Sequence, residues 1–408
     1  MEPIKRHDKR ILDNAPFGQL GLITVSGCEQ MGKEIDSYLK YWREERQHEH
    51  ADSPAFAGYL RPSYIINTKV PRFGTGEGKG VVEQSVRGMD LFILVDVVNY
   101  NETYRMFSFD NHMSPDDHFA NLKRVIAAVG GKARRITVIM PYLYESLQSK
   151  RSTRESLDCA LALQELIRMG VDNIITFDAH DPRVQNAIPL NGFDTIQPAY
   201  QFIKGLLCSV DDLQIDSDHM LIISPDEGGM KRAVYFANVL GLDMGMFYKR
   251  RDYTKIVNGD NPIVAFEFLG SSVKDKDMIV IDDMIDSGDS ALEVAQALKK
   301  RGAKRVFLFA TFGLFTAGLD KFDQAYRKGV IDRIFTTNLI YQPEELLARP
   351  WHYSCDMSKF LAYIIDTLNH DSSISDLLLP SERIWSIVSR YKEARQSKTD
   401  SNEAVKPQ

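Results

Sequence analysis

The chain has 408 residues, of which 44% are hydrophobic and 26% are charged, and its formal net charge at pH 7 is −6. This length predicts about two globular domains, and the acidic balance argues against a nucleic-acid partner, because nucleic-acid-binding proteins usually carry a basic excess. No apolar run approaches the ~20 residues of a membrane-spanning helix, and the four cysteines lack CxxC spacing, so we expect a cytoplasmic protein with reduced thiols and no membrane partner.

Short apolar runs rich in β-forming residues recur along the chain, and helical patterns separate them. Continuous apolar strands that alternate with helices are typical of parallel sheets covered on both faces. The segment 155–170 has apolar residues at three- and four-residue spacing and ends at a glycine, so it predicts one of these helices. The pattern predicts an α/β fold with strands at residues 91–97, 135–140, 173–178, 220–226, 278–283, 306–311 and 333–338.

Two passages, 122–142 and 292–312, resemble each other: in each, a helix ends at glycine, a basic pair follows and a strand begins. This repeat indicates two similarly built halves, and the turn formers in 191–200 place the boundary between them near 195–200. The last residues lack an apolar anchor, which is typical of a disordered tail. The predicted organisation is an N-terminal extension (1–16), one α/β domain (17–197), a second α/β domain with an added helical segment at 351–378 (198–394), and the tail (395–408).

Acidic residues stand where three of the predicted strands end. Asp178 and His180 close one strand, Asp226 closes another, and Asp282 with Asp283 closes a third. In open parallel sheets, ligands bind at the carboxyl ends of strands. Carboxylates there can accept hydrogen bonds from sugar hydroxyls or hold Mg²⁺.

The third strand end continues into a loop of small and acidic residues before a helix expected to begin at Ala291. Backbone amides, two hydroxyls and the helix dipole make such a turn suited to phosphate, and a ribose phosphate would satisfy both the loop and the acidic pair. The alternative is an ordinary strand-to-helix turn in which a serine or aspartate caps the helix. The loop residues are Asp286, Ser287, Gly288, Asp289 and Ser290.

The segment 248–253, with the sequence YKRRDY, places three adjacent cations after an apolar run. Taken alone, it is typical of a solvated basic turn. Beside acidic strand ends that could carry Mg²⁺ and phosphates, it becomes a candidate lid whose cations stabilise a transferring phosphoryl group.

Seven segments in order across residues 20–340 together resemble the ribose-phosphate diphosphokinases, also called phosphoribosyl pyrophosphate synthetases. The resemblance implies two phosphoribosyltransferase-like domains, each with a mainly parallel sheet, and transfer of the diphosphoryl group of Mg-ATP to the C1 hydroxyl of ribose 5-phosphate. It also implies a homo-oligomer built from dimers, with a hexamer as the larger assembly. The N-terminal piece, the inserts near 42–70 and 98–117, and the region after 345 have no clear counterpart. The segments are RFGTGE, SVRGMDLFIL, IMPYLYESLQSKR, ITFDAH, ISPDEGGMKRA, YKRR and IVIDDMIDSGDS.

The resemblance also implies a role for each matching residue. Lys249 and Arg251 would be catalytic, and His180 and Asp226 would bind Mg²⁺. The ribose 5-phosphate contacts would be Asp226, Asp282, Asp283 and the loop from Asp286 to Ser290. The ATP contacts, in a site completed by a neighbouring subunit, would be Phe73, Glu77, Gln148, Lys150 and His180. Each has a structural alternative, since Phe73 could be a core residue, Glu77 a surface carboxylate and His180 a satisfied core histidine.

Several positions depart from the family pattern. Gly74 and Thr75 stand where the family usually has Ser-Asp, Leu147 replaces an arginine, and Ser149 replaces an aspartate. Asp289 occupies a position that is generally small, and a carboxylate beside a bound phosphate opposes binding. It must therefore point outward, be screened by a cation, or cap the empty loop in place of phosphate. For the missing arginine, the nearby Lys150 or Arg151 is close enough in sequence to substitute.

These departures leave two alternatives to an active synthetase. A weakly active or inactive relative that regulates a partner or senses nucleotides would explain Leu147, Thr75 and Asp289. A phosphoribosyltransferase shares the acidic pair and the phosphate loop, but it needs neither the YKRR segment nor a second α/β half.

Overall fold

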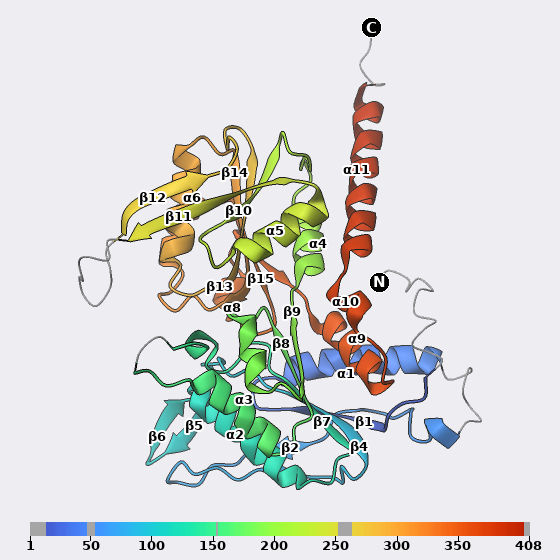
Figure 1. Ribbon diagram of the computed structural model, residues 1–408. Coiled ribbons are helices and arrows are strands. Elements are labelled where there is room, and N and C mark those ends of the chain that lie inside the picture. The colour runs from blue at the N-terminus through green and yellow to red at the C-terminus, as the bar shows by residue number, and fades with distance from the viewer. Residues whose placement is uncertain (1–13, 47–53, 152–153, 252–262, 404–408) are drawn as a thin grey trace. The chain divides into compact units, whose positions relative to one another are not determined.

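The computed structural model describes residues 14–46, 54–151, 154–251 and 263–403, without the side chains of residues 54, 249–251, 263–265 and 397–403. The chain divides into two compact units, which are described separately (Figure 1). Unit 1 contains residues 1–197, 339–341 and 356–379, and unit 2 contains residues 198–338, 342–355 and 380–408. The division after residue 197 coincides with the predicted boundary, but the segment 356–379, predicted as part of the second domain, belongs to unit 1.

Unit 1 is built on a sheet of five parallel strands, most of whose residues are buried. Helices α2 (Pro115–Val129) and α3 (Asp158–Arg168) follow its strands β4 and β7. The smaller elements are two antiparallel pairs, β2 (Thr68–Lys69) with β3 (Val81–Val82) and β5 (Thr103–Met106) with β6 (Phe109–His112). The order of the main sheet is β1 (Gln19–Thr24), β4 (Met89–Leu94), β7 (Arg135–Ile139), β8 (Asn173–Phe177) and β9 (Gly192–Ile196).

A buried ionic contact explains why the late segment joins unit 1. Helix α1 (Glu29–Glu45) packs on α9 (Ser358–Asn369), which α10 (Ser375–Leu378) follows. The guanidinium of Arg43 lies 3.0 Å from Asp366 Oδ1 and donates to Asn369 Oδ1 at 2.7 Å. Because a buried charge must be paired, this contact ties the two helices together.

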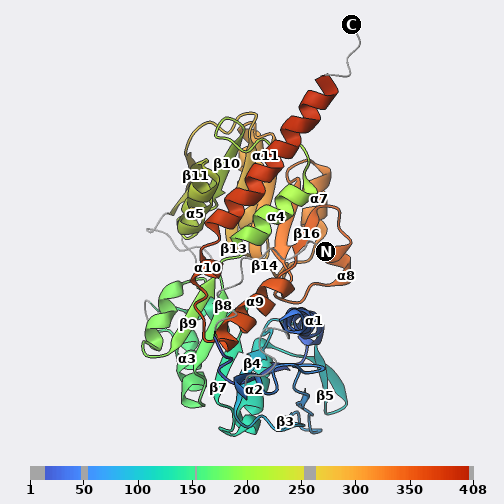
Figure 2. The same ribbon diagram turned by 90° about the vertical axis from the view of Figure 1, so that its right-hand side faces the viewer.

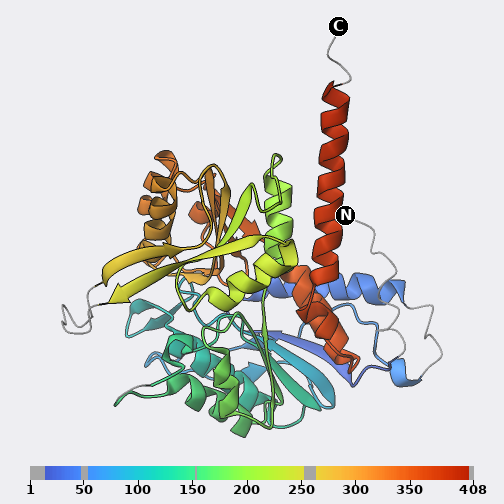
Figure 3. The same ribbon diagram turned by 45° about the horizontal axis from the view of Figure 1, so that its top comes forward.

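Unit 2 contains a seven-stranded sheet that is parallel except for the pair β11–β12, which is antiparallel and forms an arm (yellow in Figure 3). Helix α11 (Ser381–Glu403) lies along α4 (Ala199–Ser209) (Figure 2), and the Tyr391 hydroxyl donates to the Val210 carbonyl at 2.9 Å. The order of the strands is β12 (Ile263–Leu269), β11 (Asp243–Arg251), β10 (Met220–Ser224), β13 (Asp277–Ile285), β14 (Arg305–Gly313), β15 (Arg333–Thr337) and β16 (His352–Cys355).

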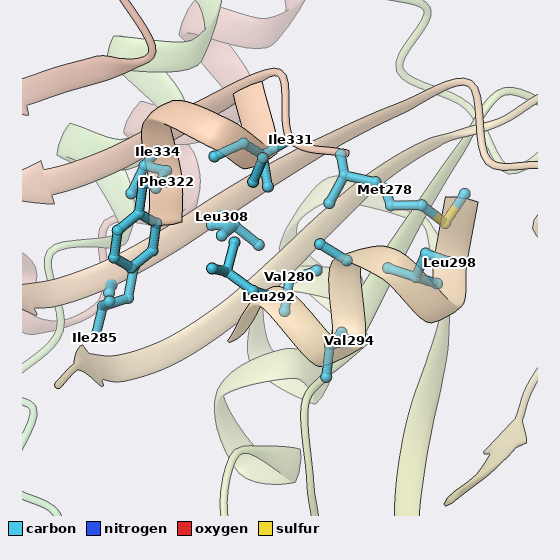
Figure 4. Packing of buried hydrophobic residues seen from close by; sticks show 14 of the residues in the cluster. Met278, Val280, Ile285, Leu292, Val294, Leu298, Leu308, Phe322, Ile331 and Ile334 are labelled. Carbon is cyan, nitrogen blue, oxygen red and sulfur yellow. The ribbon is translucent and has the colours of Figure 1, made fainter. Parts of the chain in front are cut away.

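One core cluster of unit 2 holds two helices against this sheet (Figure 4). Helix α6 (Asp289–Lys300) contributes Leu292, Val294 and Leu298, and α7 (Asp320–Arg327) contributes Phe322. Burial of such side chains is worth roughly 1.5–3 kcal/mol each, so the cluster fixes both helices. The remaining helices of the unit are α5 (Met230–Leu240) and the short α8 (Glu344–Leu347). Across the described part of the chain, no helix is both long enough and apolar enough to span a membrane.

The predicted repeat has a counterpart in each unit. Arg135 of β7 forms a bidentate ion pair with Asp90 of β4, its registered partner, with both N···O distances at 2.8 Å. Arg305 of β14 pairs in the same way with Asp277 of β13, at 2.8 and 2.6 Å. The basic residue after each helix therefore ties the start of one central strand to the next.

The turn-rich stretch 191–200 contains β9 and the start of α4 at Ala199, and the predicted boundary falls between these two elements. Strand pairing with β8 overrides the weak local preference in the first half of the stretch. Two local predictions are wrong. The segment YKRR is the end of β11 and not a loop, since it pairs with β12. Residues 395–403, expected to be disordered, continue α11, which extends a helix already anchored by Tyr391.

Candidate active site

The strand order of unit 2 predicts where its site lies. The chain passes from β10 outward to β11 and β12, and then returns to place β13 on the other side of β10. In open α/β sheets, ligands bind at such a reversal, outside the carboxyl ends of the two strands. Asp226 follows β10, and Asp282 and Asp283 lie near the end of β13, so the topology brings these predicted residues to one edge.

Asp282 and Asp283 lie within β13, which runs two residues beyond the predicted strand end. The Asp283 amide donates to Asp282 Oδ1 at 2.9 Å. The pair also has a cation that the sequence did not predict: Arg232 Nη2 lies 3.3 Å from Asp283 Oδ2, and its Nη1 lies 4.0 Å from Asp282 Oδ1. Burial and the neighbouring Asp283 carboxylate raise the pKa of Asp282 well above its usual range.

The loop after β13 has a backbone that only glycine fits easily. Gly288 has φ +88°, and a Cβ at this position would lie 2.1 Å from Phe322 Cζ, so both conformation and space exclude a side chain. The hydroxyl of Thr316 donates to Asp286 Oδ1 at 2.6 Å. Helix α6 begins at Asp289, two residues earlier than predicted, with Gly288 as its N-cap.

The contacts of Asp289 decide among the three options for this residue. Its carboxylate is 78% exposed, and Lys321 of α7 donates to Oδ1 at 2.6 Å. The Ser287 hydroxyl donates to Oδ2 at 2.9 Å. The Lys321 ammonium holds the pKa of Asp289 below its usual range. Asp289 is therefore exposed and screened by a cation, and it also accepts a hydrogen bond from the serine hydroxyl of the loop.

The turn after β10 is fixed by the residue predicted to bind Mg²⁺. Asp226 Oδ1 accepts the Gly229 amide at 3.1 Å, and the Ser224 hydroxyl donates to the Asp226 carbonyl at 2.6 Å. A Cβ on Gly229 would lie 2.9 Å from Ser224 Oγ, so the glycine permits this close turn. The Asp226 side chain remains exposed at the strand edge.

The two residues predicted to be catalytic cations lie on a strand of the same sheet. The backbones of Lys249 and Arg251 belong to β11, where they are registered with Phe266 and Ile263 of β12. Their side chains, and residues 252 and 253 of the predicted lid, lie outside what the structure describes.

Phe73 and Glu77, which are predicted to contact ATP, lie on one tight turn of unit 1. The Phe73 amide donates to the Glu77 carbonyl at 2.8 Å, and Arg72 Nη1 donates to the Gly76 carbonyl at 2.9 Å. Phe73 is 57% exposed, so the alternative that it is a core residue is wrong. Thr75, one of the departures, donates through its hydroxyl to Glu77 Oε2 at 3.2 Å.

The remaining residues predicted to contact ATP lie after β7 and β8, two neighbouring strands of unit 1. Gln148 donates to the Ser156 carbonyl at 2.7 Å, and the His180 amide donates to Ser146 Oγ at 3.4 Å. His180 and Lys150 are exposed, so His180 is not a core histidine. The departure Leu147 is 60% exposed.

Two residues here adopt the left-handed backbone conformation that non-glycine residues rarely take. They are Glu145, with φ +56°, and Asp178, with φ +40°. Each adjoins a segment predicted to contact ATP, and such conformations concentrate at functional sites.

No group of three or more His, Cys, Asp or Glu side chains that could hold a metal ion occurs among the residues that the structure describes. Mg²⁺ does not need such a group, because it usually keeps several waters and takes one or two carboxylates together with substrate phosphates. The exposed carboxylate of Asp226 fits that requirement. The assignment of His180 to the metal rests on the resemblance alone, since Mg²⁺ prefers oxygen ligands.

Sequence reasoning missed Arg232, Thr316 and Lys321. Arg232 carried the only local signal, because it is a cation in the first turn of the helix that follows the acidic end of β10. Thr316 and Lys321 reach the loop from 30 and 32 residues away, and no local pattern indicates such a contact.

The chain is similar to known proteins over most of its length. Residues 20–170 match the family model of the N-terminal domain of ribose phosphate pyrophosphokinase, and residues 260–379 match that of the phosphoribosyl synthetase-associated domain. The second match extends to residue 379, so the prediction that the region after residue 345 has no counterpart in the family is wrong up to that residue.

Two curated relatives and one solved structure agree. A ribose-phosphate pyrophosphokinase from Buchnera aphidicola subsp. Schizaphis graminum is 31% identical over 330 residues, which cover 79% of this chain and 95% of that protein. One from Vibrio parahaemolyticus is 29% identical over 342 residues, which cover 79% and 98%. The crystal structure of phosphoribosylpyrophosphate synthetase from Mycobacterium smegmatis superposes with a TM-score of 0.66 at 21% identity, and the match covers 87% of this chain and all of that chain, which supports the fold.

Proposed function

The chain belongs to the ribose-phosphate pyrophosphokinase family, and on that premise we propose that it transfers the diphosphoryl group of Mg-ATP to the C1 hydroxyl of ribose 5-phosphate. The products are phosphoribosyl pyrophosphate and AMP, for nucleotide biosynthesis. The observation that carries the proposal is the edge of unit 2 at the reversal of the sheet, where an acidic pair near the end of β13 lies with the glycine turn that follows β10 and the phosphate-type loop that follows β13.

The ribose would bind to the acidic pair. Asp282 and Asp283 are hydrogen-bond acceptors, which suits sugar hydroxyls, and Arg232 keeps cationic charge beside them. The 5-phosphate would bind the loop from Asp286 to Ser290 at the start of α6. There the first helical amides have no acceptor within the helix and the dipole favours an anion.

Asp226 would hold Mg²⁺ through its exposed carboxylate. When bound there, the ion would offset negative charge on the phosphates of ATP. Two glycines follow Asp226 in the turn before α5, and their lack of side chains leaves room for a diphosphate near the backbone.

In the transfer, the anomeric oxygen forms a bond to the β-phosphorus while the bond from that phosphorus to the α-phosphate oxygen breaks. AMP leaves, and the proton of the hydroxyl passes to solvent. Lys249 and Arg251 at the end of β11 would stabilise charge on the transferring group.

Phe73, Glu77, Gln148, Lys150 and His180 would bind ATP. The support is that Phe73 and His180 are exposed and not buried in the core of unit 1. An aromatic ring exposed on a tight turn is also suited to a site shared between subunits, so we infer a homo-oligomer built from dimers. We also infer a cytoplasmic location, since none of the four cysteines, all of which the structure describes, forms a disulfide.

The second candidate function is a weakly active or inactive relative that regulates a partner or senses nucleotides. One observation favours it: Leu147 is 60% exposed, at a position where the resemblance implies that an arginine is usual. An exposed leucine supplies no charge to a phosphate.

Lys249→Ala tests the proposed reaction. We expect the turnover number for AMP formation to fall by orders of magnitude, while calorimetry shows nearly unchanged binding of ribose 5-phosphate, because the lysine would act on the transferring group alone. Lys274→Ala, which removes an exposed lysine of the same unit, is the control and should keep the wild-type rate. A Lys249→Ala protein with full turnover would contradict the assignment.

A further inference from the structure

An acidic residue opens the helix that the proposed phosphate loop precedes. Asp289 is the first residue of α6, where backbone amides attract anions. Its own carboxylate is therefore a competitor and a source of repulsion for any phosphate bound there. Lys321 Nζ lies 2.6 Å from Asp289 Oδ1, so the carboxylate already has a partner.

The loop is also contacted by Thr316, which precedes α7, and by Phe322 of α7. The Thr316 hydroxyl donates to Asp286 at 2.6 Å, and its backbone amide donates to the Asp286 carbonyl at 3.2 Å. The ring of Phe322, the residue after Lys321, occupies the space beside Gly288.

Phe322 is fully buried in the cluster shown in Figure 4, together with Ile285 at the end of β13 and Leu292 of α6. This packing fixes the backbone that carries Lys321 relative to the backbone that carries Asp289. The ion pair is thus held by two packed helices and does not depend on two freely moving side chains.

We propose that Lys321 is a positioning residue of the phosphate loop, whose ammonium group neutralises Asp289 and holds its carboxylate away from the bound phosphate. The inference rests on the proposed function, because it takes the loop as the site of the 5-phosphate. A small neutral residue at position 289 would leave the loop amides available to the phosphate. In this chain the negative charge of Asp289 is instead balanced by a lysine from the next helix.

The size of the effect follows from Coulomb's law at an exposed site. In water, one charge pair about 4 Å apart changes affinity roughly fivefold, and a dianionic phosphate doubles the energy. The Asp289 side chain is 78% exposed, so the aqueous limit applies. Loss of Lys321 should therefore raise the KM for ribose 5-phosphate about five- to thirtyfold at low salt.

The test compares four proteins in steady-state AMP formation and in calorimetric titration with ribose 5-phosphate. They are the wild type, Lys321→Ala, Lys321→Ala combined with Asp289→Ala, and Lys328→Ala. Lys328 is an exposed lysine at the other end of α7, and its removal controls for a general loss of positive charge. Alanine is compatible with a helix at positions 289 and 321, and Lys328 is the C-cap that follows α7.

We expect Lys321→Ala to raise the KM and the dissociation constant for ribose 5-phosphate, to leave the KM for ATP unchanged, and to lose this defect at high salt. Removing Asp289 as well should restore most of the affinity, which loss of a merely structural lysine would not allow. Lys328→Ala should match the wild type.

Unchanged affinity in Lys321→Ala, or a double variant as weak as the single one, would overturn the inference. A wild type that binds ribose 5-phosphate with the expected order of variants but forms no AMP would refute the proposed reaction and support the role of Lys321. A wild type that does not bind ribose 5-phosphate would refute both.

Discussion

Replacing Arg232 with alanine would expose how the acidic pair of unit 2 is maintained. The Arg232 side chain is 10% exposed, and its Nη2 lies 3.3 Å from Asp283 Oδ2, which is itself almost fully buried. The second contact, to Asp282, is longer at 4.0 Å. Arg232→Ala removes this cation from beside two adjacent carboxylates.

Removal of one partner from a buried ion pair costs roughly 3–5 kcal/mol. The Asp282 side chain is 32% exposed, so water offsets part of this loss, and we expect about 2–4 kcal/mol. For a domain of this size, 1 kcal/mol corresponds to roughly 2–4 °C in Tm, which predicts a decrease of about 5–15 °C. The remaining acids should also protonate more readily, so the KM for ribose 5-phosphate should rise.

The assay is differential scanning calorimetry with AMP-release kinetics on the same preparations. Lys231→Ala is the matched control, because Lys231 is the exposed neighbour of Arg232 on α5, and its Tm should stay near that of the wild type. Adding Asp283→Asn to Arg232→Ala should recover part of the lost stability by removing one of the two like charges. An Arg232→Ala protein that melts with the control would refute the reasoning.

Three further outcomes follow from the sites. Gly288→Ala should lower Tm and raise the KM for ribose 5-phosphate. The control is Gly241→Ala, because Gly241 also has a positive φ but its Cβ would meet nothing within 4 Å; it should show only the smaller cost of backbone strain. Equal effects of the two substitutions would exclude a clash with Phe322 as the cause. A carboxyl with a raised pKa takes up its proton at a higher pH than an ordinary aspartate. The KM for ribose 5-phosphate should therefore rise as the pH falls through the raised pKa of Asp282, and Asp282→Asn should remove this pH dependence. A wild-type KM that stays constant under acidic conditions would contradict the prediction. Leu147→Arg should increase kcat/KM for ATP if the exposed leucine has replaced a phosphate contact; unchanged kinetics would show that the position does not limit activity.

The sheets were predictable because their central strands are buried on both faces. A run such as Met278–Ile281 is continuously apolar, and that pattern needs no tertiary information. The edge and flanking strands were not predictable in the same way. β11 ends in YKRR and β9 begins at a glycine, so pairing with a neighbour, and not local preference, makes them strands.

The candidate site likewise contains residues that could be predicted from the sequence and residues that could not. The acids and the glycine of the loop were predicted because they are contiguous in sequence around β13. Their partners were not, since Lys321 meets Asp289 only after α6 and α7 pack on the sheet. The placement of α9 in unit 1 likewise depends on the contact between Arg43 and Asp366, which are 323 residues apart.

The central claim is most directly tested by AMP release from ATP with the purified full-length chain. We predict that AMP forms only when ribose 5-phosphate and Mg²⁺ are both present, with one phosphoribosyl pyrophosphate for each AMP. No AMP at saturating substrates would contradict the account and favour a regulatory or nucleotide-sensing role.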